Sequence, residues 1–166
     1  MSLEISQPTR DKIADLLTRY PARQGALLPI LHLVQDELGA LSLEALDWVA
    51  RQIEVSPATV YGVATFYPMF RMEPVGQHHI KVCASLPCAL AGCRELIKAL
   101  EEKLGIKVGQ TTPDGRFTLS KTECLAACTE APAVLVNKKL HRKVTAENAS
   151  EFLNGLDLDG TAPRGH

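Results

Sequence analysis

The chain has 166 residues, 46% apolar and 22% charged, and this composition excludes wholesale disorder. Its formal net charge of −1 excludes a broad electrostatic attraction to nucleic acid or to an anionic membrane. The longest nearly uncharged apolar stretch, residues 26–34, is far shorter than the roughly 18 residues that suggest a membrane-spanning helix. The first residues resemble neither an export signal nor a transit peptide, so we expect a cytosolic protein without direct membrane insertion.

Residues 1–76 show the pattern of a small bundle of amphipathic helices. Apolar side chains recur at helical spacing in four segments, at about residues 13–20, 27–38, 43–53 and 57–67. Each segment is bounded by residues that start or stop helices: Pro21, Gly39, Ser42, Ser56 and Pro68. The aromatic residues Tyr61, Phe66 and Tyr67 follow the helical spacing of the fourth segment. We expect them in the core, although such a row is also compatible with a surface for a partner.

The periodicity changes near residue 76, and residues 77–157 predict a second domain with the element order β-α-β-β-β-α. Alternating patterns predict strands at residues 79–83, 116–122, 133–136 and 140–144. Helical patterns predict helices at residues 92–105 and, after an N-cap at Thr145, up to residue 156. This order indicates an α+β or α/β domain around one sheet. Residues 158–166 are predicted to form a flexible tail.

All five cysteines lie in the second domain, and four of them form two pairs. Cys83 and Cys88 are the ends of a C-x4-C segment, and Cys124 and Cys128 are the ends of a C-x3-C segment. Both segments follow predicted strands. An odd number of cysteines in a chain without an export signal argues against a disulfide framework. Thiolates are soft ligands that select iron–sulfur clusters, zinc or copper(I), so the pairs predict a metal centre.

The spacing of the pairs favours a [2Fe–2S] cluster, in which each iron takes two protein thiolates. A single zinc ion would also accept four thiolates, and a zinc-stabilised interaction module stays open as an alternative, although structural zinc sites favour C-x2-C. The segments between the cysteines are apolar and would exclude water. Their backbone amides, at residues 84–86 and 125–127, are candidates for hydrogen bonds to sulfur. The Ser85 hydroxyl either joins them or bonds only the loop backbone.

The fifth cysteine, Cys93, falls in the first turn of the helix predicted at residues 92–105. Its spacing departs from the C-x4-C-x2-C pattern of plant-type ferredoxins, since four residues rather than two separate it from Cys88. We therefore expect a small buried apolar side chain. A role as a ligand or a spare thiol is the alternative.

Three motifs accompany the cysteine pairs: YGVATFY at residues 61–67, GQTTPDGRFT at 109–118 and ECLAACTEAP at 123–132. On these motifs and the cysteine spacing, about residues 8–155 resemble the thioredoxin-like [2Fe–2S] ferredoxins. The resemblance implies a thioredoxin-like fold for residues 77–157 and one [2Fe–2S] cluster on Cys83, Cys88, Cys124 and Cys128. It leaves Cys93 outside the ligand set.

Within this family the chain resembles the small iron–sulfur subunits of bacterial NADH:quinone oxidoreductase (NADH dehydrogenase, respiratory complex I). That similarity implies an electron-transfer subunit of an enzyme, bound as a heterodimer to a flavoprotein that carries FMN and NADH. The cluster would exchange single electrons with the FMN. The chain has no GxGxxG phosphate loop, so we expect no NADH oxidation by the isolated chain.

The implied location is cytoplasmic, at the inner face of the bacterial plasma membrane, as a peripheral part of a complex. The alternative is the homologous small subunit of a soluble NAD-linked hydrogenase or formate dehydrogenase. The sequence barely distinguishes this alternative from the respiratory subunit.

Overall fold

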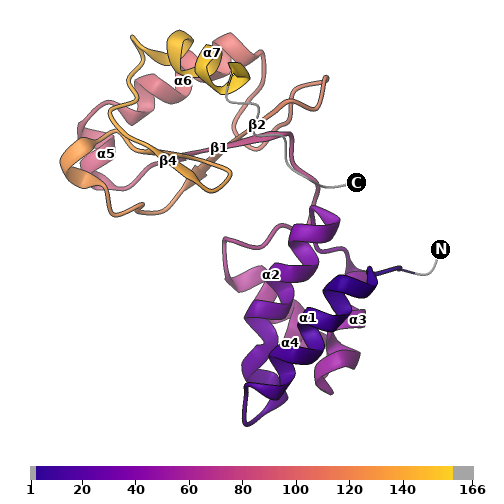
Figure 1. The fold of residues 1–166 in the computed structure, drawn as a ribbon. Coiled ribbons are helices and arrows are strands. Elements are labelled where there is room, and N and C mark those ends of the chain that lie inside the picture. The colour runs from indigo at the N-terminus through magenta and orange to yellow at the C-terminus, as the bar shows by residue number, and fades with distance from the viewer. Residues whose placement is uncertain (1–2, 159–166) are drawn as a thin grey trace. The chain divides into compact units, whose positions relative to one another are not determined.

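A computed structural model describes residues 3–158, which form two compact units, residues 3–74 and residues 75–158 (Figure 1). Each unit has its own hydrophobic core. In the part of the chain from residue 3 to residue 158, no helix is both long enough and apolar enough to cross a bilayer.

The first unit consists of four α-helices and a short 3-10 helix. They are α1 (Gln7–Thr18), η1 (Arg23–Ala26), α2 (Leu27–Leu38), α3 (Leu43–Ile53) and α4 (Pro57–Phe66). The Ser42 hydroxyl accepts the Ala45 N–H and the Ser56 hydroxyl accepts the Thr59 N–H, each at 3.2 Å, so both predicted caps are confirmed. The core is made of fully buried aliphatic side chains: Ile30, Leu31, Val34, Leu41, Leu46, Val49 and Val60.

Helix α1 begins at Gln7, before the apolar pattern starts, with Pro8 in its first turn, where proline is compatible with a helix start. One expectation for the first unit is wrong. Phe66 is 77% exposed and Tyr61 is 48% exposed, so these two aromatic side chains are not core residues. Helix α4 buries Val60 and Ala64 instead, and a helix of ten residues has only one face to bury.

The second unit is built on a four-stranded mixed sheet in the order β2-β1-β3-β4. The strands are β1 (His78–Cys83), β2 (Phe117–Thr122), β3 (Val134–Val136) and β4 (Lys139–His141). Strands β1 and β2 are parallel, whereas β3 is antiparallel to both of its neighbours, β1 and β4. The predicted α/β class with a single sheet is confirmed.

Helices α5 (Leu86–Leu90), α6 (Cys93–Leu104) and α7 (Ala149–Leu158) and the 3-10 helix η2 (Cys128–Glu130) complete the second unit. Helix α6 packs on β1 and β2 and also contacts α7, as Figure 1 shows. The centre of this core is fully buried and aliphatic: Ile80, Val82, Leu96, Leu100 and Leu119. The predicted tail at 158–166 lies outside the described residues, apart from Leu158 at the end of α7.

Three local differences separate the second unit from the sequence prediction. Helix α5 was not predicted. Strand β4 ends at His141, because the left-handed backbone of Lys143 (φ 53°) turns the chain out of the sheet. Helix α7 begins at Ala149 rather than after Thr145, because the Asn148 carboxamide accepts the Thr145 N–H at 2.9 Å and holds a non-helical turn.

Candidate metal centre

Both cysteine pairs begin at the same edge of the sheet. Cys83, the last residue of β1, is the register partner of Thr122, the last residue of the parallel strand β2. The Ala84 N–H continues this alignment by donating to the Thr122 carbonyl at 3.0 Å. The carboxyl ends of parallel strands meet at one edge, so the segments that carry the two pairs leave the sheet side by side.

The first pair is buried and held by a short helix. The segment after Cys83 turns into α5, with Ser85 at the N-cap position and Pro87 in the first turn, where its missing N–H costs nothing. This turn returns the chain so that the thiols of Cys83 and Cys88 are hydrogen-bonded to each other. Each of the two residues is 2% exposed.

The second pair lies on the surface, in a loop with one left-handed residue. Cys124 and Cys128 are exposed, and their thiols are hydrogen-bonded to each other. Between them, Ala126 has φ 56°, a conformation that costs free energy in a residue with a side chain. In this conformation the Ala126 N–H donates to the Cys124 Sγ at 3.4 Å. The left-handed conformation of Ala126 thus directs a backbone N–H at the Cys124 sulfur.

One hydrogen bond connects the two segments directly. The backbone N–H of Leu125, in the second segment, donates to the sulfur of Cys83 in the first. Cys83 and Cys128 also interact electrostatically. The structure therefore brings the four predicted ligand residues into one neighbourhood as two pairs. Among the described side chains no three His, Cys, Asp or Glu groups already surround a single ion site; a two-iron cluster needs two thiolates at each iron.

The surroundings of Cys83 favour its thiolate form. Burial raises the pKa of Cys83, but the amides of Ser85 and Leu125 and the hydroxyl of Ser85 donate to its sulfur and outweigh burial, so the net pKa is below the ordinary value. The thiolate is the form that binds metal. Of the two alternatives for the Ser85 hydroxyl, a hydrogen bond to sulfur or to the loop backbone only, the structure has the bond to sulfur.

The second thiol of each pair resists ionisation. Burial and the adjacent Cys83 raise the pKa of Cys88, although the Ala133 N–H donates to its sulfur. Hydrogen bonding to Cys124 and electrostatic interaction with it raise the pKa of Cys128. Two neighbouring thiolates repel each other, and a bound cation removes this repulsion.

These residues fit an iron–sulfur cluster. Four thiols would supply the terminal ligands, and backbone N–H groups from three separate segments, those of Ser85, Leu125 and Ala133, donate to the sulfurs of Cys83 and Cys88. Such amide hydrogen bonds stabilise the negative charge of the sulfurs in iron–sulfur proteins. The predicted contribution of the Ala84 amide is wrong, because that N–H is used by the sheet.

The fifth cysteine, Cys93, is buried in the core of the second unit. It is the first residue of α6, it is 1% exposed, and it belongs to the hydrophobic core together with Leu96. Burial raises the pKa of its thiol, which favours the neutral form. The expectation of a buried apolar side chain is confirmed, and its absence from the ligand set stays a prediction.

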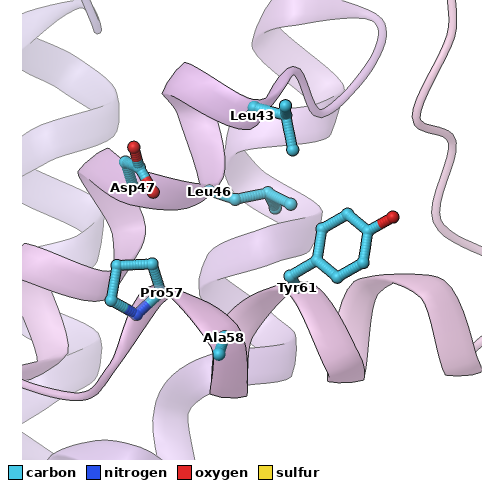
Figure 2. A pocket seen from close by; sticks show the side chains of 6 residues that line it. All are labelled: Leu43, Leu46, Asp47, Pro57, Ala58 and Tyr61. Carbon is cyan, nitrogen blue, oxygen red and sulfur yellow. The ribbon is translucent and has the colours of Figure 1, made fainter.

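A separate hollow in the first unit lies between α3 and α4 and has a volume of about 230 Å³ (Figure 2). It is lined by Leu43, Leu46, Asp47, Pro57, Ala58 and Tyr61. This apolar lining offers one carboxylate and one phenol, which is a poor donor set for a metal ion. Two of its lining residues, Leu43 of α3 and Tyr61 of α4, are exposed large apolar side chains.

Comparison with known proteins agrees with this geometry. The model of the thioredoxin-like [2Fe-2S] ferredoxin family matches residues 13–157. The chain is 41% identical over 148 residues to the E subunit of NADH-quinone oxidoreductase from Rickettsia felis, with 87% of this chain and 89% of that protein covered. Its identity to the corresponding E subunit from Rickettsia conorii is 36% over 167 residues, with 96% and 100% covered.

Two longer proteins are also similar. The mitochondrial NADH dehydrogenase [ubiquinone] flavoprotein 2 of Dictyostelium discoideum is 40% identical over 156 residues, which cover 92% of this chain and 63% of that protein. The crystal structure of an NAD+-reducing [NiFe]-hydrogenase in the air-oxidised state matches with a TM-score of 0.70 at 24% identity. That match covers 81% of this chain and 23% of the hydrogenase chain, and it shows a shared fold.

Proposed function

Since this chain belongs to the thioredoxin-like [2Fe–2S] ferredoxin family, we propose that it is the electron-transfer subunit of an NADH:quinone oxidoreductase, in the role of the E subunit of its bacterial relatives. It holds one [2Fe–2S] cluster on Cys83, Cys88, Cys124 and Cys128. The observation that carries this proposal is the register of β1 and β2, which places Cys83 level with Thr122 and so brings the two cysteine segments together at one edge of the sheet.

In this role the chain supplies ligands, a fixed position and protection from water. When bound, the cluster supplies reversible one-electron transfer. Cys83 and Cys88 are buried, so they exclude water from one side of the site, whereas Cys124 and Cys128 are exposed and leave the other side open to a redox partner. The amides of Ser85, Leu125 and Ala133 stabilise negative charge on the sulfurs.

The redox partner in this proposal is a flavoprotein subunit that binds FMN and NADH. Hydride transfer from NADH delivers two electrons to a flavin, and a one-electron centre beside it accepts one of them. We propose that the helical unit, residues 1–76 in the sequence prediction, docks this chain onto the flavoprotein. Its exposed Leu43, Tyr61 and Phe66 support this role, because large exposed apolar side chains mark interaction surfaces.

The same module in a soluble NAD-linked hydrogenase or formate dehydrogenase is the alternative host. The relatives at 36–41% identity, which the chain covers almost completely, are named as E subunits of NADH-quinone oxidoreductase, and they favour the respiratory complex. Membership of that complex would place the chain peripherally at the inner face of the bacterial plasma membrane.

The test is electron transfer in a defined mixture without oxygen. The purified chain with its cluster is combined with the purified flavoprotein and NADH, and the visible absorbance of the cluster is recorded. We expect NADH to bleach the cluster only when the flavoprotein is present. Bleaching or NADH oxidation by the chain alone would contradict the proposal that the flavoprotein, and not this chain, oxidises NADH. An unbleached cluster in a stable heterodimer would contradict the electron-transfer role.

A further inference from the structure

A groove in the second unit lies next to the first cysteine pair. Its volume is about 470 Å³, and it is bordered by Ala84 and Ala89, the chain neighbours of Cys83 and Cys88. The apolar part of its lining includes Ile97, which is buried, and Val108, which is half-buried. The groove is therefore a hollow with an apolar lining beside the proposed cluster site.

Three cations give the groove a positive charge. Arg94 and Lys98 come from α6, and Lys121 comes from the end of β2. All three side chains are exposed. Among the side chains that the structure describes, none of the three forms a salt bridge with a carboxylate. Their charges are thus available to a ligand.

The carboxylate in the groove lining, Glu101, interacts electrostatically with Lys121, but its oxygens bond to groups other than the three cations. One of its oxygens accepts the Val108 N–H at 3.0 Å, and the other accepts the Lys107 ammonium at 3.1 Å. Lys107 is not part of the groove lining. Glu101 is therefore engaged by the loop that follows α6, and the groove keeps an excess of positive charge.

Exposed apolar side chains accompany this charge. Leu86 is 71% exposed and Leu90 is 82% exposed, and both belong to α5, the helix that contributes Ala89 to the groove. Apolar surface next to a basic rim is typical of a contact with another protein. A small free anion would gain nothing from the apolar lining, whereas a polypeptide segment would bury it.

We propose that this groove receives an acidic segment of the flavin-binding partner subunit, with an apolar side chain seated on Ile97. The inference rests on the proposed function, because a subunit that exchanges electrons at the cysteine segments must cover them. Ala84 lies in the first cysteine segment and Ala89 directly follows it, and both border the groove, so the covering surface continues into it. Carboxylates of the partner pair with Arg94, Lys98 and Lys121 and fix its orientation.

The test compares two charge reversals on the same helix. Lys98→Glu changes a groove cation, and Lys103→Glu makes the same change at an exposed α6 position that does not line the groove. The dissociation constant of the cluster-loaded chain from the purified flavoprotein is measured at low and high salt. We expect Lys98→Glu to weaken binding about 3- to 10-fold and Lys103→Glu less than about 2-fold, with the difference shrinking at high salt.

The outcomes separate this inference from the proposed function. If wild-type chain binds the flavoprotein and both variants bind equally well, the groove assignment is wrong and the proposed function stands. If the wild-type chain does not bind the flavoprotein, the proposed partner and this inference both fail. Loss of self-association by Lys98→Glu would identify a second copy as the occupant. That result would overturn the inference.

Discussion

Cys83 and Thr122 are register partners at the ends of two parallel strands, although 39 positions along the chain separate them. This pairing sets the start of both cysteine segments level at one edge of the sheet. The Leu125 amide, three residues beyond Thr122, then reaches the sulfur of Cys83. The meeting of the two pairs is thus a consequence of strand register.

Replacement of one ligand should prevent formation of the cluster. Cys124→Ser removes a terminal thiolate from one iron, and a hydroxyl is a much poorer ligand for iron. We expect the variant to contain less than about a tenth of the iron of wild-type chain. The measurement is iron and acid-labile sulfide per chain after anaerobic purification.

The matched control is Cys93→Ala, which removes a buried thiol outside the two pairs. This variant should keep the full iron and sulfide content, with a destabilisation of about 1 kcal/mol from the small cavity. Loss of the cluster in Cys93→Ala, or its retention in Cys124→Ser, would show that the ligand assignment is wrong.

Removal of the Ser85 hydroxyl should lower the reduction potential of the cluster. Ser85→Ala deletes a hydrogen bond to the Cys83 sulfur, and such bonds stabilise the more negative, reduced state. A hydrogen bond of about 0.5–1.5 kcal/mol corresponds to roughly 20–60 mV for one electron. An EPR-monitored redox titration measures the shift. Thr129→Ala, which deletes a hydroxyl next to Cys128, is the control, and an equal shift there would refute the specific role of Ser85.

A side chain at Gly76 should destabilise the second unit. A Cβ at this position would lie 2.9 Å from both the Gly115 carbonyl oxygen and the Phe117 nitrogen, so the backbone would have to move. We expect Gly76→Ala to lower the free energy of unfolding by about 1–3 kcal/mol. Gly155→Ala is the control, because a Cβ there meets nothing within 4 Å and alanine favours the helix α7. Chemical denaturation measures both, and equal stability of the two variants would contradict the close approach.

The exposed ring of Phe66 should contribute to docking and little to folding. We expect Phe66→Ala to change the free energy of unfolding by less than about 1 kcal/mol, because the ring is 77% exposed. Its affinity for the flavoprotein should fall about tenfold, as for an apolar contact residue. Phe70→Ala is the opposite case, since that ring is buried and its loss should cost about 3 kcal/mol. If Phe66→Ala binds the flavoprotein with unchanged affinity, α4 is not part of the docking surface.

The strands and the main helices of the second unit could be predicted because their periodicities are local. The alternation that ends at Cys83 and at Thr122 indicates two strands, but not that they are parallel neighbours with level ends. That register depends on packing against α6 and on the crossover between the strands. From the sequence, the proximity of the two cysteine pairs could therefore be predicted only from the ligand preference of thiolates and from the family resemblance.

Other features could not be predicted from the sequence for physical reasons. Helix α5 has five residues, which is too short for a periodic pattern to stand out. The Ala133 amide that donates to Cys88 belongs to a third segment, and only tertiary structure brings it there. The exposure of Phe66 was mispredicted because aromatic spacing identifies a helical face but does not say whether that face is buried in the chain or available to a partner.

The proposed cluster is tested most directly by the metal content of the wild-type chain, combined with the EPR spectrum after reduction by dithionite. We expect two irons and two acid-labile sulfides per chain, visible absorbance, and a signal from a single unpaired electron. One zinc ion per chain without sulfide and without a signal would contradict the proposed cluster, and would identify the four thiols as a structural zinc site.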